Sequence, residues 1–465
     1  MTLPPLLMLT MLTSQTLAAL EARRQRLAVP GTSSVLLWSG QAPPRNFAAN
    51  RYPFRASSHF LYFAGLNLEQ AVIQLEAGRL TIYVDEPSPA SALWHGPTPS
   101  RDELAAAIAA VAAYPLAAVP RGPGVATIGL PDAAQRAQQA AWLQRPVRPG
   151  AESQGGDRAL AEAIIQLRLR HDAAAIAELR QAVAASVAAH QAGVRALPRA
   201  QREAEVRAAL EAELLARDLA WAYPSIVTVA GEVLHNNRYH RAIAPQDLLL
   251  MDAGAESPGG WAADITRTVP ARGRFSATQR ALYEVVLAAQ EAGIAAIRPG
   301  VEYRAIHLQA AHTLAAGLVD LGILRGQPET LVDRDAHALF FPHGIGHLLG
   351  LDVHDLEDLG DLAGYASGRQ RSDRFGLAFL RLDRPLQAGM VVTVEPGFYQ
   401  GPALLQDPAR RDLYRDCVNW ERLAQFADVR GIRIEDDVLV TATGAEVLSA
   451  ALPKAPAAVE AWVQG

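Results

Sequence analysis

Three histidines, His343, His347 and His354, stand within twelve positions of the segment HGIGHLLGLDVHD. An isolated histidine beside apolar residues is usually a hydrogen-bonded core residue. Three of them so close together favour a functional site, because a neutral imidazole is both a common metal ligand and a proton carrier.

His343 and His347 have the i, i+4 spacing of a helical zinc pair, but that motif carries a glutamate after its first histidine and lies on a helix. Gly344 and Gly346 each disfavour a helix by about 1 kcal/mol. We therefore expect a tight loop whose backbone comes close to a ligand, followed by a strand over residues 349–355.

Four acidic residues stand at the ends of β-like segments: Asp252 in LLLMD, Asp264 in DITRTV, Glu395 in VVTVEPG and Glu435 in IRIEDD. Each of them alone would read as a solvated charge. An acid that follows several aliphatic residues is drawn toward the interior, however, where a carboxylate is costly unless it is paired or binds a metal. Four carboxylates and a histidine would form an oxygen-dominated site, which suits a pair of Mn²⁺-like ions better than structural zinc.

The segment IRIEDD also has the two-residue period of a strand. Ile432 and Ile434 share one face, so Arg433 and Glu435 share the other. We therefore expect the Arg433 guanidinium beside the carboxylates.

The elements that must position these residues fall into two domains. Short aliphatic strands at 33–38, 71–78 and 79–86 alternate with an alanine-rich helical stretch at 101–114, which predicts an α/β domain. Residues 146–157 are rich in Pro, Gly and polar groups, so we place the boundary there. The prediction is an N-terminal α/β domain over 1–155 and a catalytic domain over 156–465.

The second domain begins with a helical region over 158–221, which predicts two long helices with a break near 193–198. A further helix is expected over 277–297. Strands are expected at 225–231, 247–255, 264–271, 390–399 and 432–444. This pattern predicts an α+β domain with helices flanking a largely antiparallel sheet, in which a helix, helix and strand-hairpin order occurs twice.

Composition narrows the function. Half of the 465 residues are hydrophobic, and the net charge of -5 gives no electrostatic case for binding nucleic acid. Cys417 is the only cysteine, which excludes disulfides and suits a reducing cytoplasm. The apolar stretch 1–20 lacks a basic start and carries Pro4 and Pro5, so we expect a cytoplasmic chain instead of an exported one, and no membrane partner.

Five motifs, DAG, DITRT, HGIGHLLGLDVHD, TVEPGFY and GIRIEDD, occur in this order and resemble the metallopeptidases of the pita-bread fold, which include methionine aminopeptidase, aminopeptidase P and prolidase. The resemblance covers about 160–450, and FRASSHFLYFAGL and LWHGP extend it more weakly to the N-terminal domain. It implies an α+β pita-bread catalytic domain preceded by a smaller α/β domain. The two-domain members are Xaa-Pro peptidases, so the resemblance implies a dinuclear-metal exopeptidase that acts on proline-containing di- or oligopeptides.

Carried over position by position, the resemblance implies five ligands for two divalent metal ions, with Asp264 and Glu435 bridging them: Asp252, Asp264, His347, Glu395 and Glu435. Mn²⁺ is the first expectation, with Zn²⁺ or Co²⁺ as alternatives. His354 would stabilise the oxyanion, and Glu395 would shuttle a proton to the leaving nitrogen. The resemblance further implies that His235 faces the substrate, that His343 lines the site and that Arg433 braces the carboxylates. We also expect a homodimer.

One departure from the family lies between Asp252 and Asp264, whose step of twelve is one residue longer than usual. The extra residue falls in the SPGGW hairpin, where a Gly-Gly turn would absorb it as a bulge. The doubt that this raises concerns how Asp252 binds a metal.

Substrate length depends on Arg381, which stands fourteen residues before Glu395. Its segment LRLDRPL resembles the prolidase segment in which an arginine binds the free carboxylate of a dipeptide. The forty-residue step from Glu395 to Glu435 also resembles prolidases. The alternative is that Arg381 is a surface charge beside Asp383 and Arg384.

The sequence thus favours an Xaa-Pro dipeptidase, with an Xaa-Pro aminopeptidase acting on longer peptides as the alternative. Two remote alternatives are a non-enzymatic binding protein on the same fold and a metal-free relative such as creatinase. Both are disfavoured because all five ligand positions are filled.

Overall fold

The computed structural model describes residues 12–32 and 34–465. Contacts divide the chain into two compact units. The first runs to Ile176 and includes Pro258–Gly260 and Leu356–Ala363, and the second contains Ala177–Ser257, Trp261–Asp355 and Gly364–Gly465. The predicted boundary between 155 and 156 stays a prediction.

The apolar stretch weighed above as an export signal falls largely outside the described residues. Within the described ranges, none of the helices combines the length and the apolarity that crossing a bilayer requires.

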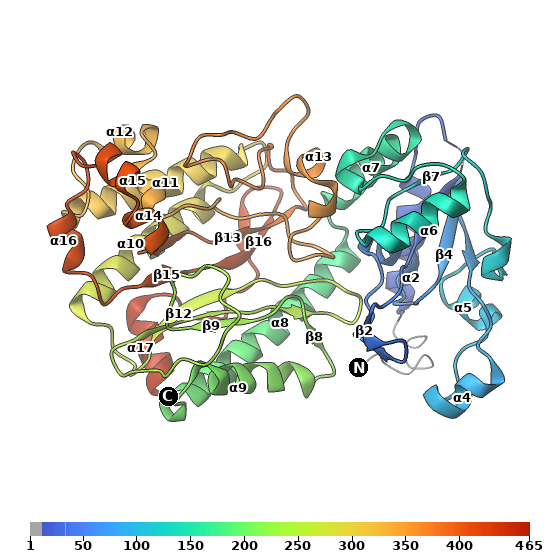
Figure 1. The fold of residues 1–465 in the computed structure, drawn as a ribbon, viewed down its shortest axis with the longest axis horizontal. Coiled ribbons are helices and arrows are strands. Elements are labelled where there is room, and N and C mark those ends of the chain that lie inside the picture. The colour runs from blue at the N-terminus through green and yellow to red at the C-terminus, as the bar shows by residue number, and fades with distance from the viewer. Residues whose placement is uncertain (1–11, 33) are drawn as a thin grey trace. The chain divides into compact units, whose positions relative to one another are not determined.

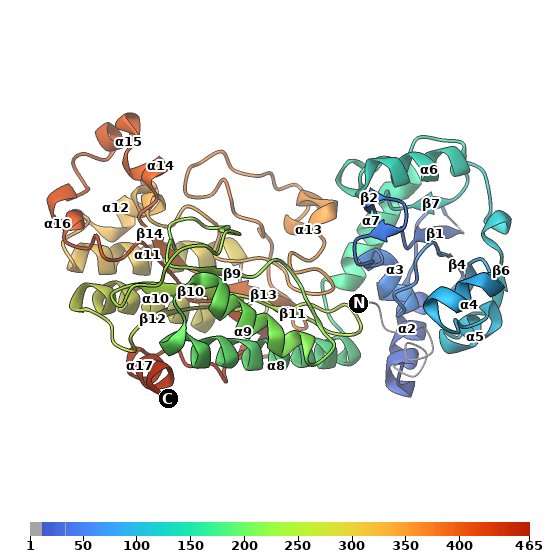
Figure 2. The ribbon, with the colours of Figure 1, turned by 60° about the horizontal axis from the view of Figure 1, so that its bottom comes forward.

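The first unit is built on a mixed five-stranded sheet whose strands follow the order β6 (Ala112–Tyr114), β5 (Arg79–Tyr83), β4 (Val72–Glu76), β1 (Val35–Trp38), β7 (Ala126–Thr127). The three inner strands are antiparallel, and each outer strand runs parallel to its neighbour. The other elements of this unit, seen in Figures 1 and 2, are α2 (Ser14–Arg26), β2 (Pro44–Phe47), β3 (Asn50–Arg51), α3 (Ser58–Ala64), α4 (Pro89–His95), α5 (Arg101–Ala107), α6 (Ala133–Leu143) and α7 (Gly155–Arg168).

The helix predicted over 101–114 is half as long in the structure. It ends at Ala107, Ala109 adopts a positive φ, and β6 then pairs in parallel with β5. The N–H of Val111 donates to Leu80 O at 2.8 Å, so sheet pairing overrides the helix propensity of the alanines.

The second unit repeats one arrangement, two helices followed by a three-stranded sheet. The first copy contains α8 (Ala173–Ala196), α9 (Glu203–Leu215), β9 (Ile226–Thr228), β10 (Leu248–Asp252) and β12 (Thr266–Pro270). The second copy contains α10 (Ala277–Ala296), α11 (Tyr303–Asp320), β13 (Val391–Val394), β16 (Asp436–Val440) and β17 (Ala445–Val447). All these strand pairs are antiparallel, so the prediction of a twice-repeated order with antiparallel sheets is confirmed.

Two short antiparallel pairs complete the strands of this unit: β8 (Ala220–Trp221) with β11 (Ala255–Glu256), and β14 (Gly397–Tyr399) with β15 (Gly431–Arg433). The remaining helices are short: α12 (Pro328–Asp333), α13 (Asp361–Gly364), α14 (Pro402–Leu405), α15 (Pro408–Leu413), α16 (Trp420–Ala424) and α17 (Pro456–Gln464).

The helical region over 158–221 contains three helices, not the two predicted. The break that the sequence analysis missed precedes α8, where the Asp172 carboxylate accepts from the N–H of Ala175 at 2.9 Å. The break predicted near 193–198 is confirmed, because α8 ends at Ala196 and α9 begins at Glu203. Gly193 lies within the helix, where an added Cβ would stand 3.4 Å from Met251 Sδ and 3.5 Å from Val206, so the glycine allows close packing.

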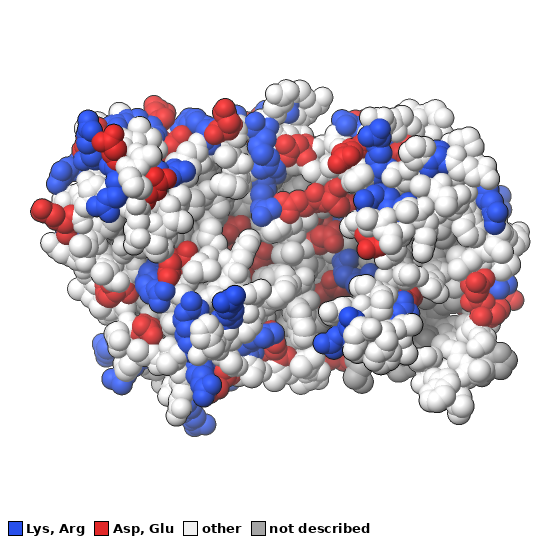
Figure 3. Space-filling model, in the orientation of Figure 1, with Lys and Arg blue, Asp and Glu red and all other residues white. Residues whose placement is uncertain are grey.

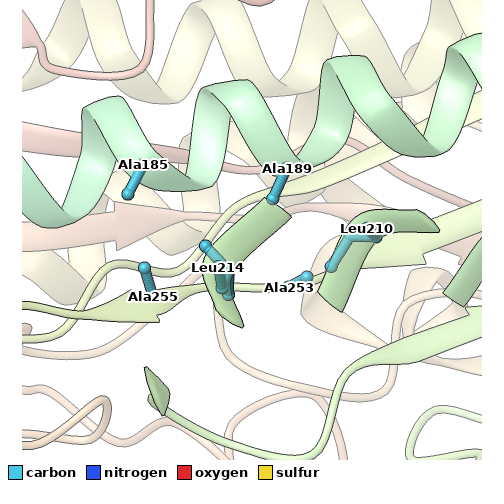
Figure 4. Packing of buried hydrophobic residues seen from close by; sticks show 6 residues of the cluster. All are labelled: Ala185, Ala189, Leu210, Leu214, Ala253 and Ala255. Atoms are coloured by element: carbon cyan, nitrogen blue, oxygen red, sulfur yellow. The ribbon is translucent and has the colours of Figure 1, made fainter. Parts of the chain in front are cut away.

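A cluster of small residues fixes the end of β10 (Figure 4). Ala253 and Ala255, which follow Asp252, pack against Ala185 and Ala189 of α8 and against Leu210 and Leu214 of α9, all of them buried. The N–H of Ala255 also donates to Ser186 Oγ at 2.8 Å. Alanine side chains let the helix approach the strand closely, which gives the backbone around Asp252 one defined position.

Candidate metal centre

Strand ends bring the four predicted carboxylates together. Asp252 is the last residue of β10, Asp264 precedes β12 by two residues, Glu395 follows β13 directly, and Glu435 lies between β15 and β16. Each carboxylate therefore leaves its strand where the ladder stops.

The HGIGH segment forms the expected loop, which runs beside β13. The N–H of Thr393 donates to His347 O at 3.0 Å, and the N–H of Glu395 donates to Ile345 O at 2.8 Å. An added Cβ at Gly346 would lie 2.2 Å from Thr393 O, so only glycine permits this approach. The pairing places the His347 imidazole beside the Glu395 carboxylate, with Nε2 3.6 Å from Oε1.

The strand predicted over 349–355 is wrong, because the chain there folds back on itself. The N–H of Asp355 donates to Leu348 O at 3.0 Å, and the Asp355 carboxylate accepts from the N–H of Asp352 at 3.1 Å. Hydrogen bonds within the loop replace a strand ladder. The turn brings the rings of His347 and His354 to a centroid distance of 4.2 Å.

Asp252 and Asp264 face each other across one phenol. Tyr223 Oη lies within hydrogen-bonding distance of Asp252 Oδ1, at 2.6 Å, and of Asp264 Oδ1, so one phenol proton is shared between the two acids. The hairpin between the two acids pairs Glu256 with Ala262, and Gly260 in its tip has a φ of 87°. The hairpin thus turns at a glycine, and both carboxylates approach the same phenol.

Arg433 and Glu435 lie on the same face, as the two-residue period predicts, and Thr266 connects them. The Arg433 Nε donates to Thr266 Oγ1 at 3.1 Å, and that hydroxyl donates to Glu435 Oε2 at 2.6 Å. The Arg433 guanidinium also forms an ion pair with Asp252, and it donates to Tyr399 Oη at 3.3 Å. Arg433 is therefore the counter-charge inside the carboxylate cluster.

Burial and mutual repulsion raise the pKa values of Asp264, Glu395 and Glu435. Burial, followed by the charge of Asp252, raises the pKa of Asp264 to about 8. Burial raises the pKa of Glu395 to about 7, against the opposing charges of His347 and Arg433. Burial and the charges of Asp264 and Glu395 raise the pKa of Glu435 well above its usual range. One guanidinium does not balance three buried carboxylates and the half-buried Glu395, so the cluster favours added positive charge.

Close ligand atoms fall into three overlapping groups: Asp264, His347 and His354; His347, Glu395 and Glu435; and Asp252, Asp264 and Glu435. Within each group the candidate atoms lie within 4.8 Å of one another. Carboxylate oxygens with one or two imidazoles are ligands that hard or borderline divalent cations accept. The residues present therefore fit divalent metal ions.

The remaining predicted site residues surround this cluster. His343 Nε2 lies 2.8 Å from Tyr399 Oη, and burial, with the nearby charge of Arg433, lowers the pKa of His343 to about 3. The pKa of His235 is lowered by the surrounding protein and by the charges of Arg433 and Arg381, partly offset by Asp252. His235 therefore lies close enough to the cluster to be affected by the charges of Asp252 and Arg433, and Arg381 lies close enough to affect His235.

Sequence reasoning missed two residues of this site. Tyr223 stands in WAYPSIV and Thr266 in DITRT, and neither has a spacing that distinguishes it from a core residue. Periodicity could not predict the roles of these two hydroxyl groups, because each one hydrogen-bonds to a carboxylate from a distant segment of the chain.

Comparisons with known proteins identify the family of this chain. The model of metallopeptidase family M24 matches residues 177–442, and that of the aminopeptidase P N-terminal domain matches residues 20–122. A probable Xaa-Pro aminopeptidase of Sordaria macrospora is 31% identical over 458 residues, 94% of this chain and 93% of the relative. A human Xaa-Pro dipeptidase is 41% identical over 229 residues, but this covers 48% of this chain and 44% of the relative.

Solved structures agree as well. Aminopeptidase P of Escherichia coli with the inhibitor Pro-Leu has a TM-score of 0.77 and 27% identity, covering 96% of this chain and 98% of that one. This likeness confirms the expected α+β pita-bread domain preceded by a smaller α/β domain. The chain belongs to metallopeptidase family M24.

Proposed function

We propose that this chain is a metal-dependent Xaa-Pro aminopeptidase, which removes the residue that precedes proline from the N-terminus of a peptide. The observation that carries the proposal is the convergence of four buried or half-buried carboxylates and the His347 imidazole on one space. The relative that matches nearly the whole chain is named an aminopeptidase, whereas the named dipeptidase matches about half of it. The dipeptidase preference predicted from the sequence therefore has less support than its alternative.

For the metal ligands we propose the five residues expected from the family resemblance: Asp252, Asp264, His347, Glu395 and Glu435. Asp264, His347 and Glu435 each belong to two of the three groups of close ligand atoms. A carboxylate can offer one oxygen to each of two ions, whereas His347 uses its Nδ1 on Leu348 O, which supports bridging roles for Asp264 and Glu435. Divalent ions bound there would polarise the scissile carbonyl and activate a water molecule for attack.

The protein side chains around the ligands have distinct proposed roles. His354, packed against His347, would donate a hydrogen bond to the oxygen that becomes negative in the transition state. Glu395 would take a proton from the attacking water and deliver it to the leaving nitrogen. His235 and His343 would contact the substrate, and Arg433 would hold Asp252 in place through the ion pair between them.

Proline dictates what the substrate pocket must recognise. The scissile nitrogen belongs to a tertiary amide and carries no N–H, so the enzyme must bind the ring and its restricted geometry. We keep Arg381 as a substrate-binding residue, because its charge acts on His235 at the site. In an aminopeptidase this guanidinium would interact with a carbonyl or a carboxylate beyond proline.

The experiment is a comparison of substrate lengths with the purified chain supplied with Mn²⁺. We expect kcat/KM on an Xaa-Pro-Yaa tripeptide to exceed that on the Xaa-Pro dipeptide by about tenfold or more, which corresponds to ~1.4 kcal/mol. Mass spectrometry should detect the free Xaa residue and Pro-Yaa. A higher kcat/KM on the dipeptide, lost selectively in Arg381→Ala, would restore the dipeptidase assignment.

Several finer properties belong to the same proposal. We propose Mn²⁺ as the metal because the ligand set is dominated by oxygen, with Zn²⁺ or Co²⁺ as the alternatives. We also propose a homodimer, a cytoplasmic location consistent with the single cysteine, Cys417, and a domain boundary at 155–156.

A further inference from the structure

His235 lies in a loop without regular secondary structure, between β9 and β10. Among the described residues, none forms a hydrogen bond with its imidazole ring, and the side chain is exposed. Nothing in its own side-chain contacts orients the imidazole, so its position depends on the backbone that carries it.

The start of α9 holds both ends of this loop, residues 229–242. Glu203 lies at the centre of these contacts. The Glu203 side chain is fully buried. Its Oε1 accepts from Thr228 Oγ1 at 3.0 Å and from the N–H of Val229 at 2.9 Å, and its Oε2 accepts from the N–H of Arg241 at 3.2 Å. One carboxylate thus ties the first residue of the loop to a residue near its end.

The link continues to the neighbour of His235. Thr228 Oγ1 accepts from Asn236 Nδ2 at 2.8 Å, and Asn236 Oδ1 accepts from the N–H of Arg238 at 3.1 Å. A chain of hydrogen bonds therefore runs from Glu203 through Thr228 to Asn236, which is adjacent to His235 in the sequence.

Backbone contacts also hold the two ends of the loop. The N–H groups of Glu203 and Ala204 donate to Arg241 O and Tyr239 O, both at 3.1 Å, which satisfies two unpaired donors of the helix start. At the other end, Gly231 approaches Gly431 so closely that an added Cβ would lie 2.7 Å from its carbonyl oxygen. The segment around His235 is suspended between these two anchors.

We propose that Glu203 is a positioning residue for His235: it fixes the loop that presents the imidazole to the substrate. This inference rests on the proposed peptidase function. A carboxylate is costly to bury unless its hydrogen bonds are made, and Glu203 accepts one from the end of β9 and two from the loop, so its position defines that of the loop.

Glutamine tests this role with little change in size. In Glu203→Gln the amide NH₂ must face one of the donors, either the N–H of Arg241 or that of Val229, so at least one bond becomes a repulsion. We expect kcat/KM on Xaa-Pro-Yaa to fall about 10- to 100-fold, as expected for a displaced site residue. The matched control is Glu205→Gln, an exposed position in the same helical turn, which should stay within about twofold of wild type.

A double-mutant cycle separates positioning from general destabilisation. If Glu203 acts through His235, Glu203→Gln should cost less than about twofold in a His235→Ala background. An undiminished loss in that background, or wild-type activity of Glu203→Gln, would overturn the inference. Bound metal should stay unchanged in both single variants, because the proposed ligands lie outside this loop.

If Glu203→Gln does not fold, a second variant tests the same proposal. Thr228→Val retains the shape but removes the hydroxyl between Glu203 and Asn236, and it should show the same dependence on His235. Failure of the wild-type chain to cleave any Xaa-Pro peptide would instead refute the proposed function. The two failures are therefore distinguishable.

Discussion

At the scale of single residues, the negative charge of the site exceeds the positive charge that the protein places beside it. Four carboxylates converge where Arg433 is the counter-charge, and two hydroxyls, those of Tyr223 and Thr266, satisfy part of their hydrogen-bonding capacity. The raised pKa values of Asp264 and Glu395 have burial as their first cause. We therefore expect the removal of one carboxylate to weaken metal binding more than it lowers the stability of the fold.

We expect Glu435→Ala to lower the number of bound divalent ions and to reduce kcat by more than about 100-fold. The variant loses a metal ligand itself, and the loss of a residue that only hydrogen-bonds to a ligand already costs about 10- to 100-fold. Elemental analysis and steady-state kinetics measure the two effects. The control is Glu446→Ala, which removes a half-exposed acid paired with Arg180. Equal losses in both variants would contradict the ligand assignment.

His354→Ala should act mainly on kcat, on the order of 100-fold, as expected for one lost donor to an oxyanion. The metal content should stay unchanged if His354 is not a ligand. A pure increase in KM would assign His354 to substrate binding, and a loss of metal would assign it to the group that it forms with Asp264 and His347.

Sequence reasoning succeeded for residues with a pattern and failed for those without one. The strand-end acids and the glycine-spaced histidines are brought together as expected, because strand ends and close backbone approaches have sequence signatures. Tyr223 could not be identified in this way, since its role depends on a contact with Asp264 across 41 residues.

At the scale of elements, small side chains between α8, α9 and β10 hold the Asp252 end of the strand (Figure 4). Ala189→Leu should destabilise the protein by about 1–3 kcal/mol, because the added methylenes overfill a packed core. Chemical denaturation measures the change. Ala184→Leu, at an exposed position of the same helix, is the control and should change stability little. Equal stability of both variants would show that α8 and β10 pack loosely.

Elements were predicted well where periodicity and packing agree. The helix over 277–297 is observed as α10, Ala277–Ala296, because Ser276 caps it and one of its faces is buried. The strand predicted over 349–355 failed because the Asp355 carboxylate and Leu348 carbonyl close a loop, a choice that alternation of apolar residues does not encode.

At the scale of the whole molecule, buried histidines should make stability depend on pH. Burial is the first cause that lowers the pKa of His307 to about 4 and of His337 to about 3. The unfolded chain binds these protons near pH 6.5, so the free energy of unfolding should fall as pH drops from about 6.5 toward about 4.

Replacement of His337 tests this dependence. Neither of its ring nitrogens has a hydrogen-bond partner in the described part of the chain. Between pH 7 and pH 5, wild type should lose about 2 kcal/mol more stability than His337→Leu, from 1.5 pH units at 1.36 kcal/mol each. The control is His240→Leu, at an exposed position, which should leave the difference between pH 7 and pH 5 close to that of wild type. Parallel curves for all three proteins would contradict the assignment.

The charge distribution agrees with a small-molecule or peptide substrate. On the face shown in Figure 3, positive and negative side chains lie in short groups of both signs, separated by uncharged surface. The net charge of the full sequence is -5.

We propose that one cluster of carboxylates and an imidazole binds two divalent ions, and that the cleavage of Xaa-Pro bonds requires these ions. The most direct test is to remove metal with a chelator, restore Mn²⁺ in steps, and measure bound metal and the hydrolysis of Xaa-Pro-Yaa and Xaa-Ala-Yaa on the same samples. We expect no cleavage without metal, recovery as occupancy approaches two ions per chain, and activity on the proline peptide only. Full activity of metal-free protein, or equal cleavage of the alanine peptide, would contradict the account.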